Sequence, residues 1–114
     1  MATIRGDQLR GHLEGLILAA LERGTAHGWD IWRSLETASS GALELKEGSI
    51  YPALYRLERQ GLIAARWETS TADRPGPRRR IYRLTAKGRR RLGVARDEWH
   101  QFVAVLGSLL GAPA

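Results

Sequence analysis

Apolar residues recur at three- and four-residue steps near the start of the chain, and this spacing is typical of one face of a helix. The positions are Leu9, Leu13, Leu16, Ile17, Ala20 and Leu21. They predict a helix from about Gln8 to Arg23, which Gly24 ends. Gly11 and Gly15 lie on another face of this helix. Because each costs about 1 kcal/mol relative to alanine, we expect another backbone to approach closely there.

Two more helices follow, from about Gly28 to Ser39 and from about Glu47 to Gln60, with a short extended piece at residues 42–45 between them. The apolar side of the third helix is Ile50, Ala53, Leu54 and Leu57. At about 100° per residue, the opposite side carries Ser49, Pro52, Tyr55, Arg56 and Arg59, with Tyr51 on its flank. The proline lies within about the first turn, where its missing N–H is tolerated.

Residues 62–70 and 78–85 alternate apolar and polar positions around a segment dense in turn formers, which predicts a β-hairpin. The apolar positions are Ile63, Ala65 and Trp67 on one face of the first strand, and Ile81 and Leu84 in the second. Residues 78–80 are all arginine. Alternation along a strand should divide these three side chains between its two faces.

Thr85 is a favourable N-cap for a last helix, from about Ala86 to Leu110. Apolar residues in it step by three and four like a heptad seam, at Leu92, Ala95, Trp99, Phe102, Leu106 and Leu109. Such a helix is roughly 37 Å long, more than the rest of the chain can cover, so we expect it to pair with a second copy. The charge-free segment 101–114 is shorter than the roughly 20 residues of a membrane span.

The predicted fold is mainly α with a small β-hairpin: a winged helix-turn-helix over residues 1–84, a dimerisation helix over 85–110 and a frayed tail at 111–114. In this fold the second helix of the pair enters the major groove of DNA. There Ser49, Tyr51, Tyr55, Arg56 and Arg59 would contact phosphates and base edges. The arginines of the hairpin would contact the DNA backbone or the minor groove.

The distribution of charge supports a polyanionic partner. Residues 46–96 hold 14 Lys and Arg against four Asp and Glu, whereas the segments on either side are weakly acidic. The chain has no cysteine, which excludes disulfides, thiolate zinc sites and a cysteine nucleophile, and fits a reducing cytoplasm. His12, His27 and His100 show no clustered spacing of metal ligands, so we expect no metal and no cofactor.

Three segments of the chain closely resemble the PadR family of transcriptional regulators: "LRGHLEGLILAALERGTAHGWDI", "GSIYPALYRLERQGLI" and "RRRIYRLTAKGRRRL". The resemblance covers about residues 8–110, and the single C-terminal helix looks like the short-tailed subfamily. It implies a homodimeric winged helix-turn-helix, usually a repressor, that a small ligand releases from its operator. Two such helices related by a two-fold axis predict a palindromic operator. By position, Ser49, Tyr51, Pro52 and Arg56 match the recognition helix of the family, and Gly76, Arg78 and Arg79 match its wing.

Two positions depart from the pattern of the family. Lys46 stands where a Ser or Thr often caps the recognition helix, and a lost cap costs about 1 kcal/mol. A cation at a helix N-terminus is also unfavourable to the dipole, although a nearby DNA phosphate would offset this, so Lys46 joins the expected DNA contacts. Trp29 replaces the more usual Tyr, which removes a hydroxyl from that site.

Two interpretations of Trp99 stay open. In one it only packs the dimer interface; in the other it and its symmetry mate line a cavity for a flat aromatic or cationic ligand, as in some short-tailed PadR proteins. Gln8 and His12 would then contribute to the walls of this cavity.

A winged-helix module that docks an acidic protein, without binding DNA sequence-specifically, is the alternative. An enzyme is not expected, because the sequence has no Gly-rich phosphate loop, paired-carboxylate site or Ser–His–Asp arrangement that falls in one cleft.

Overall fold

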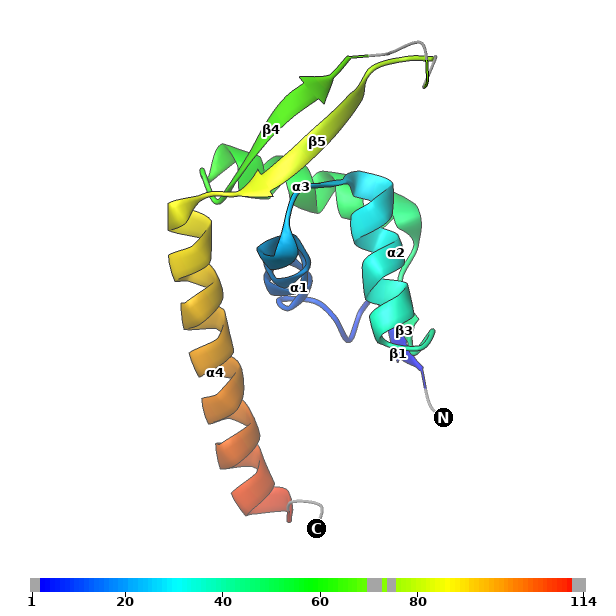
Figure 1. Ribbon diagram of the computed structural model, residues 1–114. Helices are drawn as coiled ribbons and strands as arrows, with labels where there is room; N and C mark the ends of the chain where they lie inside the picture. Colours follow the sequence, from blue (N-terminus) through cyan, green and yellow to red (C-terminus); the bar gives the residue numbers. More distant parts are fainter. Residues whose placement is uncertain (1–2, 70–72, 74–75, 112–114) are drawn as a thin grey trace.

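The chain folds as a helical domain with a β-hairpin and a long last helix that extends away from it (Figure 1). The structure, a computed structural model, describes residues 3–69, 73 and 76–111. The α-helices are α1 (Leu13–Ala20), α2 (Gly28–Ala38), α3 (Ile50–Arg59) and α4 (Ala86–Leu110). Two 3-10 turns, η1 (Leu21–Arg23) and η2 (Glu47–Ser49), flank α1 and α3. The strands are β1 (Ile4–Arg5), β2 (Ala26–His27), β3 (Leu43–Glu44), β4 (Ile63–Glu68) and β5 (Arg79–Leu84).

The predicted hairpin is confirmed, and β2 adds a third strand to it. The antiparallel sheet has the order β2-β5-β4, with β4 and β5 paired from Ile63↔Leu84 to Glu68↔Arg79. The second strand turns Tyr82 and Leu84 to the core, both 7% exposed, whereas Ile81 lies on the other face. Strand β4 extends beyond the core. Trp67 therefore is 51% exposed, although it lies on the same face of the strand as Ile63.

One core joins the three short helices to the base of the hairpin. The helices α2 and α3 insert the apolar sides that their spacing predicted. The first helix inserts Ile17 and Leu21 together with Leu18, which the predicted stripe omitted, and Leu92 adds the first half of α4. The completely or almost completely buried members are Ile17, Leu18, Leu21, Ile31, Ile50, Ala53, Leu54, Leu57 and Ile63. Burial of a side chain of this size is worth about 1.5–3 kcal/mol, so this cluster fixes how α1, α2 and α3 lie against one another.

The first helix is shorter than predicted. It begins at Leu13, not at Gln8, because turns precede it and Gly11 adopts a φ of +84°, a conformation that interrupts a helix. Leu9 is nevertheless buried, which explains why it kept the helical spacing. The predicted close approach of another backbone is found at neither glycine: an added Cβ at Gly15 would make an ordinary contact of 3.7 Å with the side chain of Ala95 on α4, and one at Gly11 would meet nothing within 4 Å.

The base of α4 is fixed against the turn between α3 and β4. The Thr85 hydroxyl caps α4 by accepting from the Gly88 N–H at 3.0 Å, as predicted, and donates to the Gly61 carbonyl at 2.7 Å. Gly88 lies so close to this turn that an added Cβ would overlap the carbonyl oxygen of Leu62. Farther along, Arg96 makes two hydrogen bonds of 2.9 and 2.8 Å to Glu22, whose pKa it lowers.

The direction of α4 therefore depends on a backbone contact that only glycine permits. We expect Gly88→Ala to lower the free energy of unfolding by about 1–3 kcal/mol, because the methyl group has no space. Urea denaturation at fixed protein concentration measures this. Gly93→Ala is the matched control, since no atom lies within 4 Å of its added Cβ. It should raise stability by up to about 1 kcal/mol. Equal effects of the two substitutions would contradict the packing argument.

Candidate nucleic-acid interface

The outer side of α3 is uncovered along its whole length. Pro52, Tyr55 and Arg59 lie opposite the buried stripe of this helix, and Tyr55 is 61% exposed. The guanidinium of Arg59 lies 5.7 Å from the centre of the Tyr55 ring. An aromatic ring and a cation at the centre of an exposed helix face are able to meet base edges and phosphates.

Tyr51 and Arg56 border this face on opposite flanks. The ring of Tyr51 packs on Gly28, where an added Cβ would lie 2.7 Å from the ring. Burial, together with the nearby Glu47 carboxylate, raises the pKa of Tyr51, so the phenol keeps its proton and acts as a donor. On the other flank, Arg56 pairs with Glu14 of α1 at 2.9 Å.

Ser49 and Lys46 lie just before the N-terminus of α3, and both are exposed. Lys46 occupies the N-cap position of η2 and makes no side-chain cap, as expected from its chemistry. Within the described part of the chain no acidic side chain forms an ion pair with it. Its ammonium group is therefore available to an external anion.

The arginines of the wing divide between the two faces of the hairpin, as alternation predicted. Arg78 and Arg80 lie over the ring of Trp67, at 5.1 and 5.4 Å from its centre. Arg80 also donates to Glu58 of α3 at 2.7 Å, which ties the wing to that helix. Arg79 lies on the other face, 3.5 Å from Glu68. Gly76 precedes them with a φ of +122°, which favours glycine.

A cleft of about 400 Å³ separates the wing from the helix pair. The phenol of Tyr51 and the guanidinium groups of Arg79 and Arg80 line it, together with His27, Gly28, Trp29, Asp30 and Tyr82. Each of these three donors faces a carboxylate in the structure: Tyr51 that of Glu47, Arg79 that of Glu68 and Arg80 that of Glu58. Trp29 occupies the wall of the cleft and lies under the guanidinium of Arg33, 5.3 Å from the centre of its ring.

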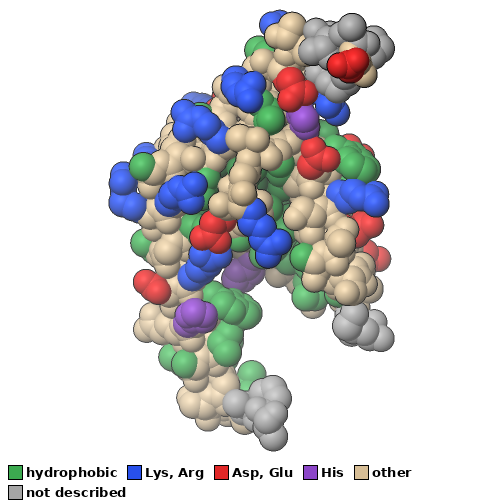
Figure 2. All heavy atoms as spheres, viewed as in Figure 1, with side chains coloured by type: hydrophobic (Ala, Val, Ile, Leu, Met, Phe, Trp, Pro, Cys, Tyr) green, Lys and Arg blue, Asp and Glu red, His purple; other side chains and the backbone are tan. Residues whose placement is uncertain are grey.

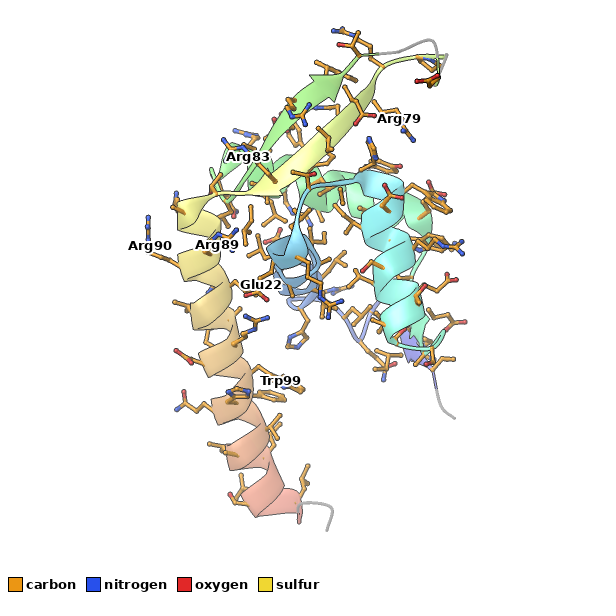
Figure 3. All side chains as sticks on the ribbon, in the orientation of Figure 1. Glu22, Arg79, Arg83, Arg89, Arg90 and Trp99 are labelled. Carbon is orange, nitrogen blue, oxygen red and sulfur yellow. The ribbon has the colours of Figure 1, made fainter. Side chains whose placement is uncertain are left out.

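A second basic surface covers the base of the hairpin and the start of α4 (Figure 2). Arg83, Arg89 and Arg90 belong to it, as the labels in Figure 3 show. These three side chains are exposed and form no ion pair with any described residue. The first turn of α4 holds no acidic residue, so the dipole and the side chains there have the same sign.

The distal half of α4 presents an uncovered apolar stripe. Two of the six predicted seam residues are used within the chain, since Leu92 is 3% exposed and Ala95 packs against Gly15. The other four are open to solvent: Trp99 51%, Phe102 51%, Leu106 36% and Leu109 76% exposed.

Three aromatic side chains gather where α4 passes α1. The ring of Trp99 stacks on Phe102 at 5.9 Å, and His12 meets its edge at 6.1 Å. Figure 3 shows Trp99 on the side of α4 that faces α1. The side chain of Gln8, the other predicted wall residue, accepts a hydrogen bond from the Arg5 N–H at 2.9 Å. Phe102 was predicted only as an interface residue, although its three-residue spacing from Trp99 places the two rings together.

Among residues 3–69, 73 and 76–111, no group of three or more His, Cys, Asp or Glu side chains is arranged to hold a metal ion. None of the described helices is both long and apolar enough to cross a membrane.

Comparison with known proteins relates this arrangement to solved regulators. A transcriptional regulator from Clostridium thermocellum shares 27% identity, with a TM-score of 0.82 over 93% of this chain and 97% of the other. A PadR family regulator from Eggerthella lenta shares 31%, with a TM-score of 0.77 over 94% and 88%. Bacillus subtilis PadR, solved with operator DNA, shares 27%, with a TM-score of 0.64 over 75% of this chain and 46% of that one. Residues 17–94 match the family described as "Transcriptional regulator PadR-like family", and the chain therefore belongs to this family of transcriptional regulators.

Proposed function

We propose that the protein is a homodimeric repressor that binds a palindromic operator and leaves it when a small aromatic ligand binds. The observation that carries the proposal is the uncovered outer side of α3, flanked by the cationic wing. The similarity to Bacillus subtilis PadR, solved with operator DNA, supports a duplex as the partner.

In the proposed complex α3 lies in the major groove. Base edges are contacted by Tyr55, Arg56 and Arg59. The N-terminal end of α3, which enters the groove, carries Ser49, Tyr51 and Pro52. Lys46 and the wing residues Gly76, Arg78 and Arg79 contact the sugar–phosphate backbone. In the cleft between wing and helix pair, one backbone phosphate replaces the carboxylates of Glu68 and Glu58 as partner of Arg79 and Arg80.

The exposed stripe on α4 supports the dimer. Four large side chains on one stripe stay open to solvent although His12 contacts two of them, and such a stripe is most simply buried against a second copy. A two-fold axis along α4 then presents two copies of α3 to successive turns of one DNA face.

The His12–Trp99–Phe102 cluster supports an aromatic ligand. In a dimer two such clusters approach the same interface, and stacked rings bind flat aromatic molecules and cations. A ligand held there contacts α1 and α4 together, and thereby biases how the two domains are placed.

The DNA-binding part is tested by recovering bound duplexes from a random pool with the purified protein. We expect a palindrome with half-sites about 10 base pairs apart, or a multiple of that spacing. Affinity should fall by about 10³–10⁵ between 50 and 200 mM salt if about 6–10 phosphates are neutralised. An operator-driven reporter should rise when the protein is removed. A protein-docking module would instead recover no common sequence.

The dimer is tested by sedimentation. Wild-type protein should have twice the 12.7 kDa mass of one chain. Leu106→Asp places a charge in the apolar stripe and should give monomers that bind the operator at least about tenfold more weakly. Val94→Asp is the control, because Val94 is also an exposed apolar residue of α4, at 47% against 36% for Leu106, but lies about 100° around the helix from the middle of the stripe. Loss of the dimer in both variants, or in neither, would argue against this interface.

The ligand site is tested with Trp99→Ala. Planar aromatic amines and carboxylates are first screened for release of the operator from wild-type protein in gel shifts. Trp99→Ala should bind the operator normally but lose release, whereas Trp99→Phe should keep part of it because a ring remains for stacking. Full release from Trp99→Ala by the same compounds would leave Trp99 as interface packing only.

A further inference from the structure

An ion pair joins α3 to α1, a helix outside the helix-turn-helix. The Nε–H of Arg56 donates to Oε1 of Glu14 on α1 at 2.9 Å, across 42 positions of sequence. The side chains are 54% and 37% exposed. At such exposure the pair adds little to stability, so its main effect is on where the Arg56 side chain is held.

The pair leaves the recognition end of the arginine free. Arg56 uses only Nε toward Glu14, and neither terminal nitrogen has a hydrogen-bond partner among the described residues. Those two nitrogens form the fork that donates to O6 and N7 of a guanine. An arginine held at Nε by a carboxylate therefore keeps its base-contacting fork while it loses freedom about its long side chain.

Glu14 is well placed to hold this arrangement. It lies on α1, whose neighbouring Ile17 and Leu18 are 0% and 1% exposed, so its backbone belongs to the core. Glu14 and Arg56 share a cleft of about 440 Å³ with Ser49 and the turn before α1. The carboxylate thus stands on a rigid element at the edge of the exposed face of α3.

We propose that Glu14 is a positioning residue for DNA recognition, which orients Arg56 toward base edges and so sets operator selectivity. This inference rests on the proposed function. It assigns a role in sequence selection to α1, outside the elements that contact DNA.

An orienting role for Glu14 predicts an effect on sequence preference that a surface ion pair without this role would not have. The charge of Glu14 repels every duplex, whatever its sequence. The order that it imposes on Arg56 favours only the matching sequence, because ordering a long side chain at an interface is costly when it is not prearranged. Removing the carboxylate therefore leaves binding to unrelated DNA unchanged or stronger, while the preference for the operator falls.

The experiment measures dissociation constants at fixed salt for two duplexes. One is the sequence recovered by wild-type protein from the random pool, and the other is a shuffled duplex of the same composition. We expect Glu14→Ala to lower the ratio of the two affinities by about threefold to tenfold, the loss that ordering one side chain on binding would cause. Glu14→Gln should stay within about twofold of wild type, because its amide oxygen still accepts from Nε.

Two further variants separate position from charge. Glu36→Ala removes an exposed carboxylate from α2 that forms no ion pair with any described residue, and its ratio should match wild type. In an Arg56→Ala background, Glu14→Ala should leave the ratio unchanged, because the effect acts through Arg56.

Several outcomes would overturn the inference. If Glu14→Ala strengthens operator binding at least as much as shuffled binding, Glu14 competes with DNA for Arg56 instead of orienting it. A ratio unchanged from wild type, or changed equally in the Arg56→Ala background, also overturns it while the proposed function stands. If wild-type protein recovers no common sequence, the proposed function and this inference fail together.

Discussion

The close approach of α4 to the turn between α3 and β4 governs the architecture. Gly88 meets the backbone of Leu62 without a side chain between them, and the Thr85 hydroxyl donates to the Gly61 carbonyl at 2.7 Å. The ammonium of Lys87 adds a 2.7 Å hydrogen bond to the carbonyl of Gln60 at the end of α3. The helices α3 and α4 are thus joined through a few close contacts at this turn, and neither can rotate without straining them.

Elements with a strong amphipathic period and a clear end signal were predictable. The bounds of α4 follow from the Thr85 cap and the last seam residues, and the structure agrees with them. The predicted start of α1 was wrong. Leu9 belongs to a turn before the helix but is buried, and its position therefore fits the three- and four-residue spacing of the helix that follows. The two-residue strands β1 and β2 have no period to detect, since their pairing is set by partners distant in sequence.

The candidate site was predictable where it follows from one helix. The angular spacing of residues around a helix predicts which side of α3 is exposed, and the structure leaves that side open as expected. Contacts between residues distant in sequence were not predictable. Glu14 reaches Arg56 across 42 positions, and Trp67 gains its two guanidinium partners only because β4 and β5 outrun the core. Leu92 kept the heptad step, yet its own domain covers it, because periodicity does not say which neighbour buries a side chain.

The rigid joint at Gly88 has a consequence for how such regulators diverge. Tilting a helix of roughly 37 Å by about 5° at its base moves the far end by about 3 Å, close to the rise of one base pair. For a dimer joined along α4, changes at the joint would alter the distance between half-sites, whereas changes on α3 would alter their letters. In such a dimer, half-site spacing and half-site sequence would depend on separate groups of residues, so that each would be able to change in evolution without the other.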